Sequence, residues 1–133
     1  MPANESNPDL QKAEAAAFRR LLEHLRARAD IHNAALLGEA GFNRNTLADW
    51  LVEASVETSR PLTREEARDI VYGEPYIAWK LRQPEPTPEQ LRRAGESVAK
   101  NAECYDQERS LTLDDQLDSS FPASDPPSIT RPR

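Results

Sequence analysis

Gly41 is the sequence feature that most constrains the fold, because it separates two short helical patterns. In the stretch 36–50, apolar residues recur at helical spacing on both sides of this glycine. Glycine adopts a positive φ without the steric penalty that a Cβ imposes, so it can end one helix in a tight turn. Asn43 is of a residue type that caps the amino-terminal ends of helices. The stretch therefore predicts a corner between a helix over 34–40 and a second helix that starts near Asn43.

Further helices are predicted on both sides of this corner. Before it, the segment 10–28 has the longest amphipathic pattern, with an apolar stripe formed by Ala15, Phe18, Leu22 and Leu25. After it, Thr63 and Glu66 form a capping box that opens a helix ending at Gly73. A short turn follows over 75–81, and the cap Thr87 with Pro88 opens a last helix over 88–104.

These patterns predict an all-α protein: a compact array of about five short helices with an appended C-terminal helix and disordered termini. The helical domain is expected to form one modest core, and no segment has the alternation typical of a strand. The expected division is a disordered N-terminus over 1–9, the helical domain over 10–82, a proline-rich linker over 83–87, the appended helix over 88–104 and a disordered acidic tail over 105–133.

The charge, the lack of a long apolar run and the single cysteine argue against several classes of function. A net charge of −6 argues against a nucleic-acid partner, since nucleic-acid binders neutralise phosphates. No apolar run reaches the length of about 18 residues that a membrane span needs, and the N-terminus shows no secretory signal, so we expect a cytoplasmic protein. Cys104 has no second cysteine for a disulfide or a thiolate metal site, and no histidine lies near it in sequence.

One alternative is that the corner is a helix-turn-helix that binds DNA. A recognition helix starting at the corner would present Asn43, Arg44, Asn45 and Asp49 outward, and asparagine and arginine suit base edges. Leu37 is bulky where close helix approach usually needs a small residue. Asp49, Glu53 and Glu57 would also place a series of negative charges along the same helix.

A second alternative is a metal-dependent enzyme. Asp30, His32 and Glu39 are the candidate ligands, although no HExxH-like spacing and no clustered carboxylate pair supports them. The sequence has no glycine-rich phosphate loop and no nucleophile elbow, so we predict no cofactor and no catalytic residue.

The leading hypothesis is a non-catalytic interaction module that forms a homo-oligomer. Trp50 is expected in the core, whereas Tyr76 and Trp79 could anchor a partner or a second copy of the chain if they are partly exposed. Leu111, Leu113 and Leu117 could form a short adhesive segment in the tail. The candidate interaction surface consists of Asn43, Arg44, Asn45, Asp49, Tyr76 and Trp79.

Two motifs, in this order, resemble a family of short bacterial proteins of unknown function. The first comprises Asp30-Ile-His-Asn33, Leu36-Leu37, Ala40-Gly41-Phe42, Arg44-Asn45, Leu47 and Trp50; the second comprises Glu65-Glu-Ala-Arg68, Ile70-Val-Tyr-Gly73, Pro75-Tyr76 and Trp79-Lys80. The similarity covers the stretch 18–81. The resemblance implies a compact multi-helical domain that self-associates, and it implies no known activity.

The chain departs from this family at the corner, where two cysteines of the family fall on Asn43 and Thr46. A thiol pair at a helix amino terminus suits metal ligation or redox chemistry. Asn43 and Thr46 cannot form a disulfide and are poor ligands for soft metals, so we expect no thiol chemistry here. The remaining role for Asn43 is to cap the helix by accepting from the backbone N–H of Asn45 or Thr46.

Overall fold

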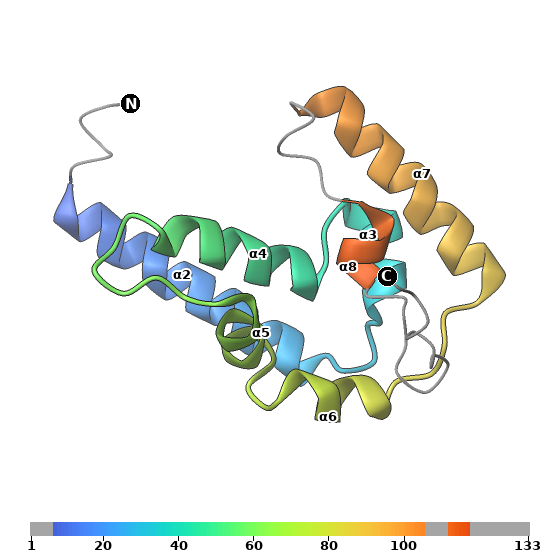
Figure 1. Ribbon diagram of the computed structural model, residues 1–133, viewed down its shortest axis with the longest axis horizontal. Helices are drawn as coiled ribbons and strands as arrows, with labels where there is room; N and C mark the ends of the chain where they lie inside the picture. Colours follow the sequence, from blue (N-terminus) through green and yellow to red (C-terminus); the bar gives the residue numbers. More distant parts are fainter. Residues whose placement is uncertain (1–6, 106–111, 118–133) are drawn as a thin grey trace, which may run out of the picture.

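A computed structural model describes residues 7–105 and 112–117. The described residues form seven helices and no strand, which confirms the all-α prediction (Figure 1). The helices are α2 (Pro8–Ala27), α3 (Asn33–Ala40), α4 (Arg44–Ser55), α5 (Arg64–Tyr72), α6 (Tyr76–Leu81), α7 (Pro88–Cys104) and α8 (Leu113–Leu117).

Helices α5 and α7 start at the capping residues that the sequence indicates. The Thr63 hydroxyl accepts from the Glu66 backbone N–H at 3.1 Å, and Glu66 Oε1 accepts from the Thr63 N–H at 2.9 Å. Thr87 and Gln90 form the equivalent pair at the start of α7, at 3.1 and 3.0 Å. Each box satisfies two backbone groups that a helix end would otherwise leave unpaired, so both starts are fixed locally.

The two predicted glycine stops are also confirmed. Gly41 ends α3 with a φ of 81°, and Gly73 ends α5 with a φ of 75°. Both values lie in the left-handed region that favours glycine. The turn at Gly41 directs the chain into α4, whose amino-terminal end forms the candidate site described below.

Three expectations about helix ends need correction. Helix α2 begins at Pro8, inside the segment expected to be disordered, because Asn7 Oδ1 accepts from the backbone N–H groups of Asp9 and Leu10. Helix α3 begins at Asn33, one residue before the expected start at 34, and His32 occupies the N-cap position. Helix α8 lies inside the segment expected to be a disordered tail. The other residues of these two segments, except Tyr105 and Thr112, lie outside the described residues.

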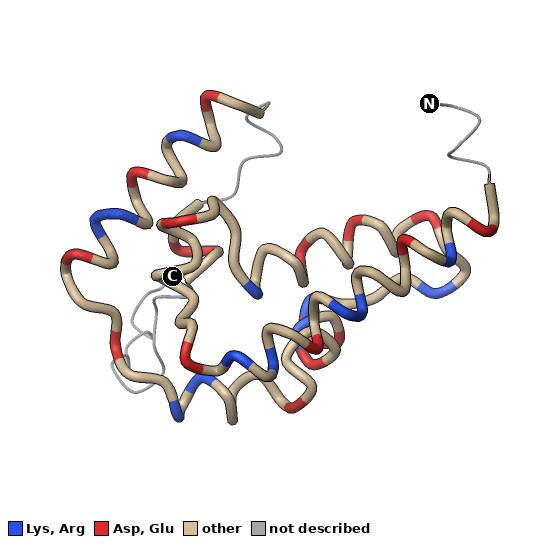
Figure 2. The backbone as a smooth tube through the Cα atoms, turned by 180° about the vertical axis from the view of Figure 1, so that it is seen from behind, with Lys and Arg blue, Asp and Glu red and all other residues tan. Residues whose placement is uncertain are grey.

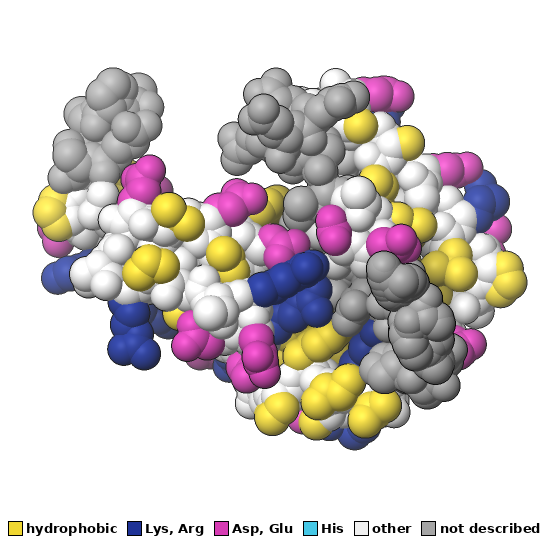
Figure 3. Space-filling model, in the orientation of Figure 1, with side chains coloured by type: hydrophobic (Ala, Val, Ile, Leu, Met, Phe, Trp, Pro, Cys, Tyr) yellow, Lys and Arg dark blue, Asp and Glu magenta, His cyan; other side chains and the backbone are white. Residues whose placement is uncertain are grey.

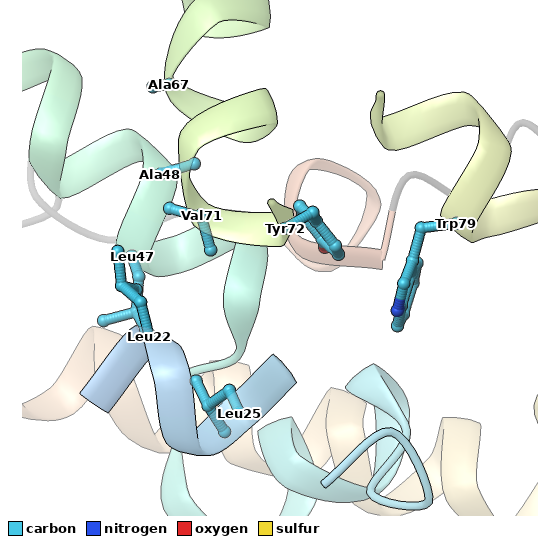
Figure 4. Close-up of a cluster of buried hydrophobic side chains, with 8 residues drawn as sticks. All are labelled: Leu22, Leu25, Leu47, Ala48, Ala67, Val71, Tyr72 and Trp79. Carbon is cyan, nitrogen blue, oxygen red and sulfur yellow. The ribbon is translucent and has the colours of Figure 1, made fainter. Parts of the chain in front are cut away.

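The core lies where α2, α4, α5 and α6 meet (Figure 4). Tyr72 and Trp79 project from α5 and α6 with ring centroids 4.7 Å apart. Trp50 was expected in this core, but it is 41% exposed and stacks on Phe42 instead. The reason is that α2 and α5 cover a different face of α4. The buried residues of the core are Leu22, Leu25, Leu47, Ala48, Ala67, Val71, Tyr72 and Trp79.

Helix α7 packs along α3, so the appended helix is docked. Gly38 permits the close approach, since a Cβ at this position would lie only 3.2 Å from Arg93 Cβ. Asn101 Nδ2 donates to the Gly41 carbonyl at 2.9 Å, and Ala94 is fully buried. This pairing forms a second layer beside the core, and α8 lies in contact with α3, α4 and α7.

Charges of both signs alternate along the described helices, most clearly on α2 and α7 (Figure 2). Such mixing provides no continuous basic stripe over the described part of the chain, and a basic stripe is what phosphate contacts would need. None of the described helices has the length and apolar character required to cross a membrane.

Candidate functional site

The amino-terminal end of α4 begins with a locally fixed cap. Asn43 Oδ1 accepts from the backbone N–H groups of Asn45 and Thr46 at 2.9 and 3.2 Å, as the sequence predicts. The Thr46 hydroxyl accepts in return from the Asn43 N–H at 3.0 Å. These bonds fix the Asn43 side chain, and its Nδ2 group is left to donate away from the helix.

The backbone carbonyl oxygen of Gln116 in α8 accepts the hydrogen bond from Asn43 Nδ2. Asn43 Nδ2 donates to this oxygen at 3.0 Å and Asn45 Nδ2 donates to the same oxygen at 2.8 Å. The Thr46 hydroxyl donates to Gln116 Oε1, and Gln116 Nε2 lies 3.4 Å from Asp49 Oδ2. Gln116 is 2% exposed. Both its backbone carbonyl and its side-chain amide are therefore held by the first turns of α4.

Arg64 completes the contact from the start of α5. Its Nη2 donates to the Asp115 carbonyl at 3.2 Å, and its Nε lies 3.4 Å from Asp49 Oδ1. Burial raises the pKa of the Asp49 carboxyl, and the neighbouring Arg64 guanidinium opposes that rise. We call Asn43, Asn45, Thr46, Asp49 and Arg64 the α8 site.

Tyr72 sets the orientation of the Asn45 amide. Its hydroxyl donates to Asn45 Oδ1 at 2.7 Å and accepts from Asn33 Nδ2 at 3.0 Å. Burial raises the pKa of Tyr72 well above its ordinary value, so the phenol stays neutral and keeps the proton that it donates. Because Oδ1 is occupied by Tyr72, the Nδ2 group of Asn45 faces Gln116.

Arg44 stabilises the corner from the inside. Its guanidinium donates to the carbonyls of Leu25, Arg28 and Ile31 at 3.0, 3.1 and 2.8 Å, and to Asn33 Oδ1 at 3.0 Å. Burial lowers the pKa of Arg44. The same group lies 5.3 Å from the ring centroid of Trp79, within the range of a cation–π contact. This arginine therefore joins the bend after α2 to the core.

The structure divides the six predicted surface residues into two groups. Asn43, Asn45 and Asp49 lie together under α8, whereas Arg44, Tyr76 and Trp79 lie against the aromatic part of the core. The outward orientation expected for a recognition helix is wrong for Asn43, Arg44 and Asn45, which are at most 2% exposed. Trp79 is buried, with only 8% of its surface exposed, and Tyr76 is half-buried.

Sequence reasoning missed Gln116 and Tyr72 as parts of this site. The available signal was weak. Thr112 caps a single turn, with its hydroxyl accepting from the Asp115 N–H at 3.1 Å, and Leu113 and Leu117 are spaced one helical turn apart.

Helix α6 exposes two apolar side chains, Ile77 and Leu81, which are 47% and 60% exposed. Hydrophobic side chains gather over this helix in Figure 3.

The three candidate metal ligands are not brought together. Asp30 accepts two bonds from Arg28 at 2.9 and 2.8 Å, which hold the pKa of its carboxyl at about 2, and Glu39 pairs with Arg93 at 2.6 Å. Across residues 7–105 and 112–117, no group of three or more His, Cys, Asp or Glu side chains could hold a metal ion.

The fold and this buried polar corner define a small all-helical protein in which the first turns of α4 hold α8 by buried hydrogen bonds. Residues 31–96 match the model of a family described as a protein of unknown function, DUF1244, so this part of the chain is similar to that uncharacterised family. The matched residues include the corner and extend from the bend before α3 into α7. No curated protein matches the chain.

Proposed function

We propose that this protein is a non-catalytic interaction module that binds a short helical segment at the α8 site and self-associates through it. The supporting observation is that two side-chain amides, Asn43 Nδ2 and Asn45 Nδ2, converge on one backbone carbonyl, that of Gln116. A main-chain oxygen with two donors is a strong anchor for a peptide segment, since backbone groups must be satisfied wherever they are buried.

The donors of the site are oriented before the segment binds. The cap at the start of α4 fixes Asn43, and the Tyr72 hydroxyl fixes Asn45. Little side-chain entropy is then lost when Gln116 docks, which favours affinity. Helix α8 has only five residues, and an isolated helix of that length is unstable in water. The site therefore supports the helical form of the segment that it holds.

Self-association follows if the segment of one copy occupies the site of another. The groups that bind Gln116 are identical in every copy, so a reciprocal exchange of α8 would form a closed symmetric dimer. Helix α8 carries the acidic residues Asp114 and Asp115, and the Asp115 backbone carbonyl accepts from Arg64, whose positive charge suits a segment of this composition. The same site could hold an acidic helical segment of another protein.

A cysteine-pairing experiment tests this proposal. Two single-cysteine chains are made in a Cys104→Ser background, one with Asp49→Cys and one with Gln116→Cys, because Asp49 and Gln116 are in contact. Oxidation of an equimolar mixture should give a covalent heterodimer, and sedimentation of the unsubstituted chain should show a mass that rises with concentration. The matched control replaces Asp49→Cys by Glu39→Cys, an exposed residue of α3, and should give no heterodimer.

The possible failures separate the two halves of the proposal. A third chain carries both Asp49→Cys and Gln116→Cys in the Cys104→Ser background. If this chain forms an internal disulfide but the mixture of single-cysteine chains gives no heterodimer, the site binds its own segment and self-association by exchange is wrong. If the internal disulfide does not form either, the site does not hold α8 in solution and the binding function is also wrong.

A further inference from the structure

A cavity of about 280 Å³ is lined in part by helix α8. Its other walls come from the start of α3, helix α6, the segment 83–86 and the first turn of α7. Leu117, the last residue of α8, belongs to the lining. Pockets for drug-sized ligands have volumes of about 300–1,000 Å³, so this cavity is large enough for one aromatic side chain.

Most of the cavity wall is apolar, and one side of it is aromatic and held firmly in place. The Trp79 ring lies 4.7 Å from Tyr72 and 6.4 Å from Tyr76 between ring centroids. Leu91 lines the cavity from α7 and is 38% exposed. A fixed aromatic wall beside a partly exposed leucine favours an apolar ring as the occupant, since its burial would remove apolar surface from water.

The end of α8 brings the chain to this cavity. The Gln116 carbonyl is held by Asn43 Nδ2 at 3.0 Å and by Asn45 Nδ2 at 2.8 Å. The next residue, Leu117, already lines the cavity. The segment 118–133, which follows the described residues, therefore starts at the cavity wall.

Phe121 is the only aromatic residue of the segment 118–133. It follows Leu117 by four residues, as Leu117 follows Leu113, so the three apolar residues recur at the spacing of one helical turn. Four residues span about 6 Å in a helix and at most about 14 Å in an extended chain. The cavity is within reach of Phe121 in either form.

We infer that the side chain of Phe121 occupies this cavity, so that the α8 site and the cavity bind one continuous segment. The inference rests on the proposed function for the docking of α8 and adds a second, apolar anchor. The amides of the α8 site hold Gln116, while the Phe121 ring packs against Trp79 and Tyr76. Any segment that replaces α8 then needs a glutamine-leucine pair followed, four residues after the leucine, by an aromatic residue.

Removal of the ring and its replacement by toluene test the inference in the full chain. Phe121→Ala should empty the cavity, and toluene, which has the shape of the lost side chain, should then bind there. His32 lines the cavity, whereas His24 is exposed on α2. Toluene should cause saturable NMR shifts of the His32 ring in Phe121→Ala but not in the unsubstituted chain, and none at His24. The matched control Ile129→Ala should behave like the unsubstituted chain.

A thiol at position 116 tests whether the cavity and the α8 site act together. In a Cys104→Ser background, Gln116→Cys should react slowly with iodoacetamide, because residue 116 is only 2% exposed. Adding Phe121→Ala should raise the rate of this reaction by about tenfold or more, since the docked segment loses the burial of one aromatic side chain. Adding Ile129→Ala should leave the rate unchanged.

The outcomes distinguish this inference from the proposed function. If Gln116→Cys is protected and Phe121→Ala leaves that protection unchanged, the α8 site stands and the inference is overturned. If Gln116→Cys already reacts as fast as it does in urea, the site does not hold α8 and both proposals are wrong. Toluene shifts at His32 that are equal in Phe121→Ala and the unsubstituted chain, or absent from Phe121→Ala, also overturn the inference.

Discussion

The Tyr72 hydroxyl donates to Asn45 Oδ1 across 2.7 Å and thereby joins the end of α5 to the first turn of α4. The bond has a second effect, because an occupied Oδ1 leaves the Asn45 Nδ2 group to donate to Gln116 at 2.8 Å. A single buried phenol therefore contributes both to the core and to the geometry of the α8 site.

Replacing Tyr72 by phenylalanine should lower the free energy of unfolding by about 1–3 kcal/mol, because Asn45 Oδ1 is left buried without a donor. Urea unfolding followed by circular dichroism measures the loss. Tyr105→Phe is the matched control, since Tyr105 is 51% exposed, and its midpoint should stay within experimental error. Equal midpoints for the two variants would show that the Tyr72 hydroxyl does not stabilise the fold.

Alkaline pH should destabilise the protein through the same residue. Burial raises the pKa of Tyr72 in the folded state, so folding favours the neutral phenol. The stabilisation is complete below the unfolded pKa of about 10 and decreases progressively as the pH rises above that value. Unfolding free energies measured between pH 8 and pH 11 should therefore fall, and the fall should be smaller in Tyr72→Phe. Parallel profiles for the two proteins would contradict this assignment.

Two glycines of the chain should respond in opposite directions to alanine. Gly73 has a φ of 75°, and a Cβ there would lie 2.7 Å from Arg26 Nε. Gly73→Ala should cost at least about 1–2 kcal/mol, because the left-handed conformation penalises a Cβ and Arg26 must also move from the carbonyls of Ile70 and Val71.

Gly95 lies inside α7, where a Cβ would meet only Leu113 Cδ2 at 3.9 Å, an ordinary van der Waals distance. Gly95→Ala should therefore stabilise the protein by about 0.5–1 kcal/mol through helix propensity. Thermal unfolding of both variants beside the parent chain measures the two shifts. A loss of stability in Gly95→Ala would mean that α7 and α8 pack more closely than this distance indicates.

Replacing Arg44 by lysine should destabilise the fold by about 2–4 kcal/mol. A single ammonium cannot reach the four oxygens that the guanidinium contacts, so buried carbonyls lose their donors. Urea unfolding measures the change. The control is Arg92→Lys on the exposed face of α7, where the expected change is within about 0.5 kcal/mol. A small effect at Arg44 would show that water replaces the lost contacts.

The sequence could predict the features that depend on residues three or four positions apart. Both capping boxes, the Asn43 cap and the glycine stops at Gly41 and Gly73 were of this kind, and the helices form where these signals indicate. The start of α2 was missed although Asn7 and Pro8 form a valid signal, because the polar composition of the segment suggested disorder.

The candidate site could not be predicted as fully, because its contacts join distant parts of the chain. Asn43 and Asn45 suit a surface as well as an interior, and their burial depends on Gln116, which follows them by more than 70 residues. The inward direction of Arg44 depends on carbonyls before α3 that no side-chain pattern reveals. Trp50 is the opposite case. Its helical spacing predicted an inward position, but α2 and α5 pack on another face of α4 and leave it exposed.

The bonds that Arg44 makes to Leu25, Arg28 and Ile31 also bear on the order of events during synthesis. These carbonyls leave the ribosome before the guanidinium that satisfies them. The bend between α2 and α3 therefore gains these hydrogen bonds only after the start of α4 has followed it out. The angle of this bend in the nascent chain is thus determined by a residue that emerges after the bend itself.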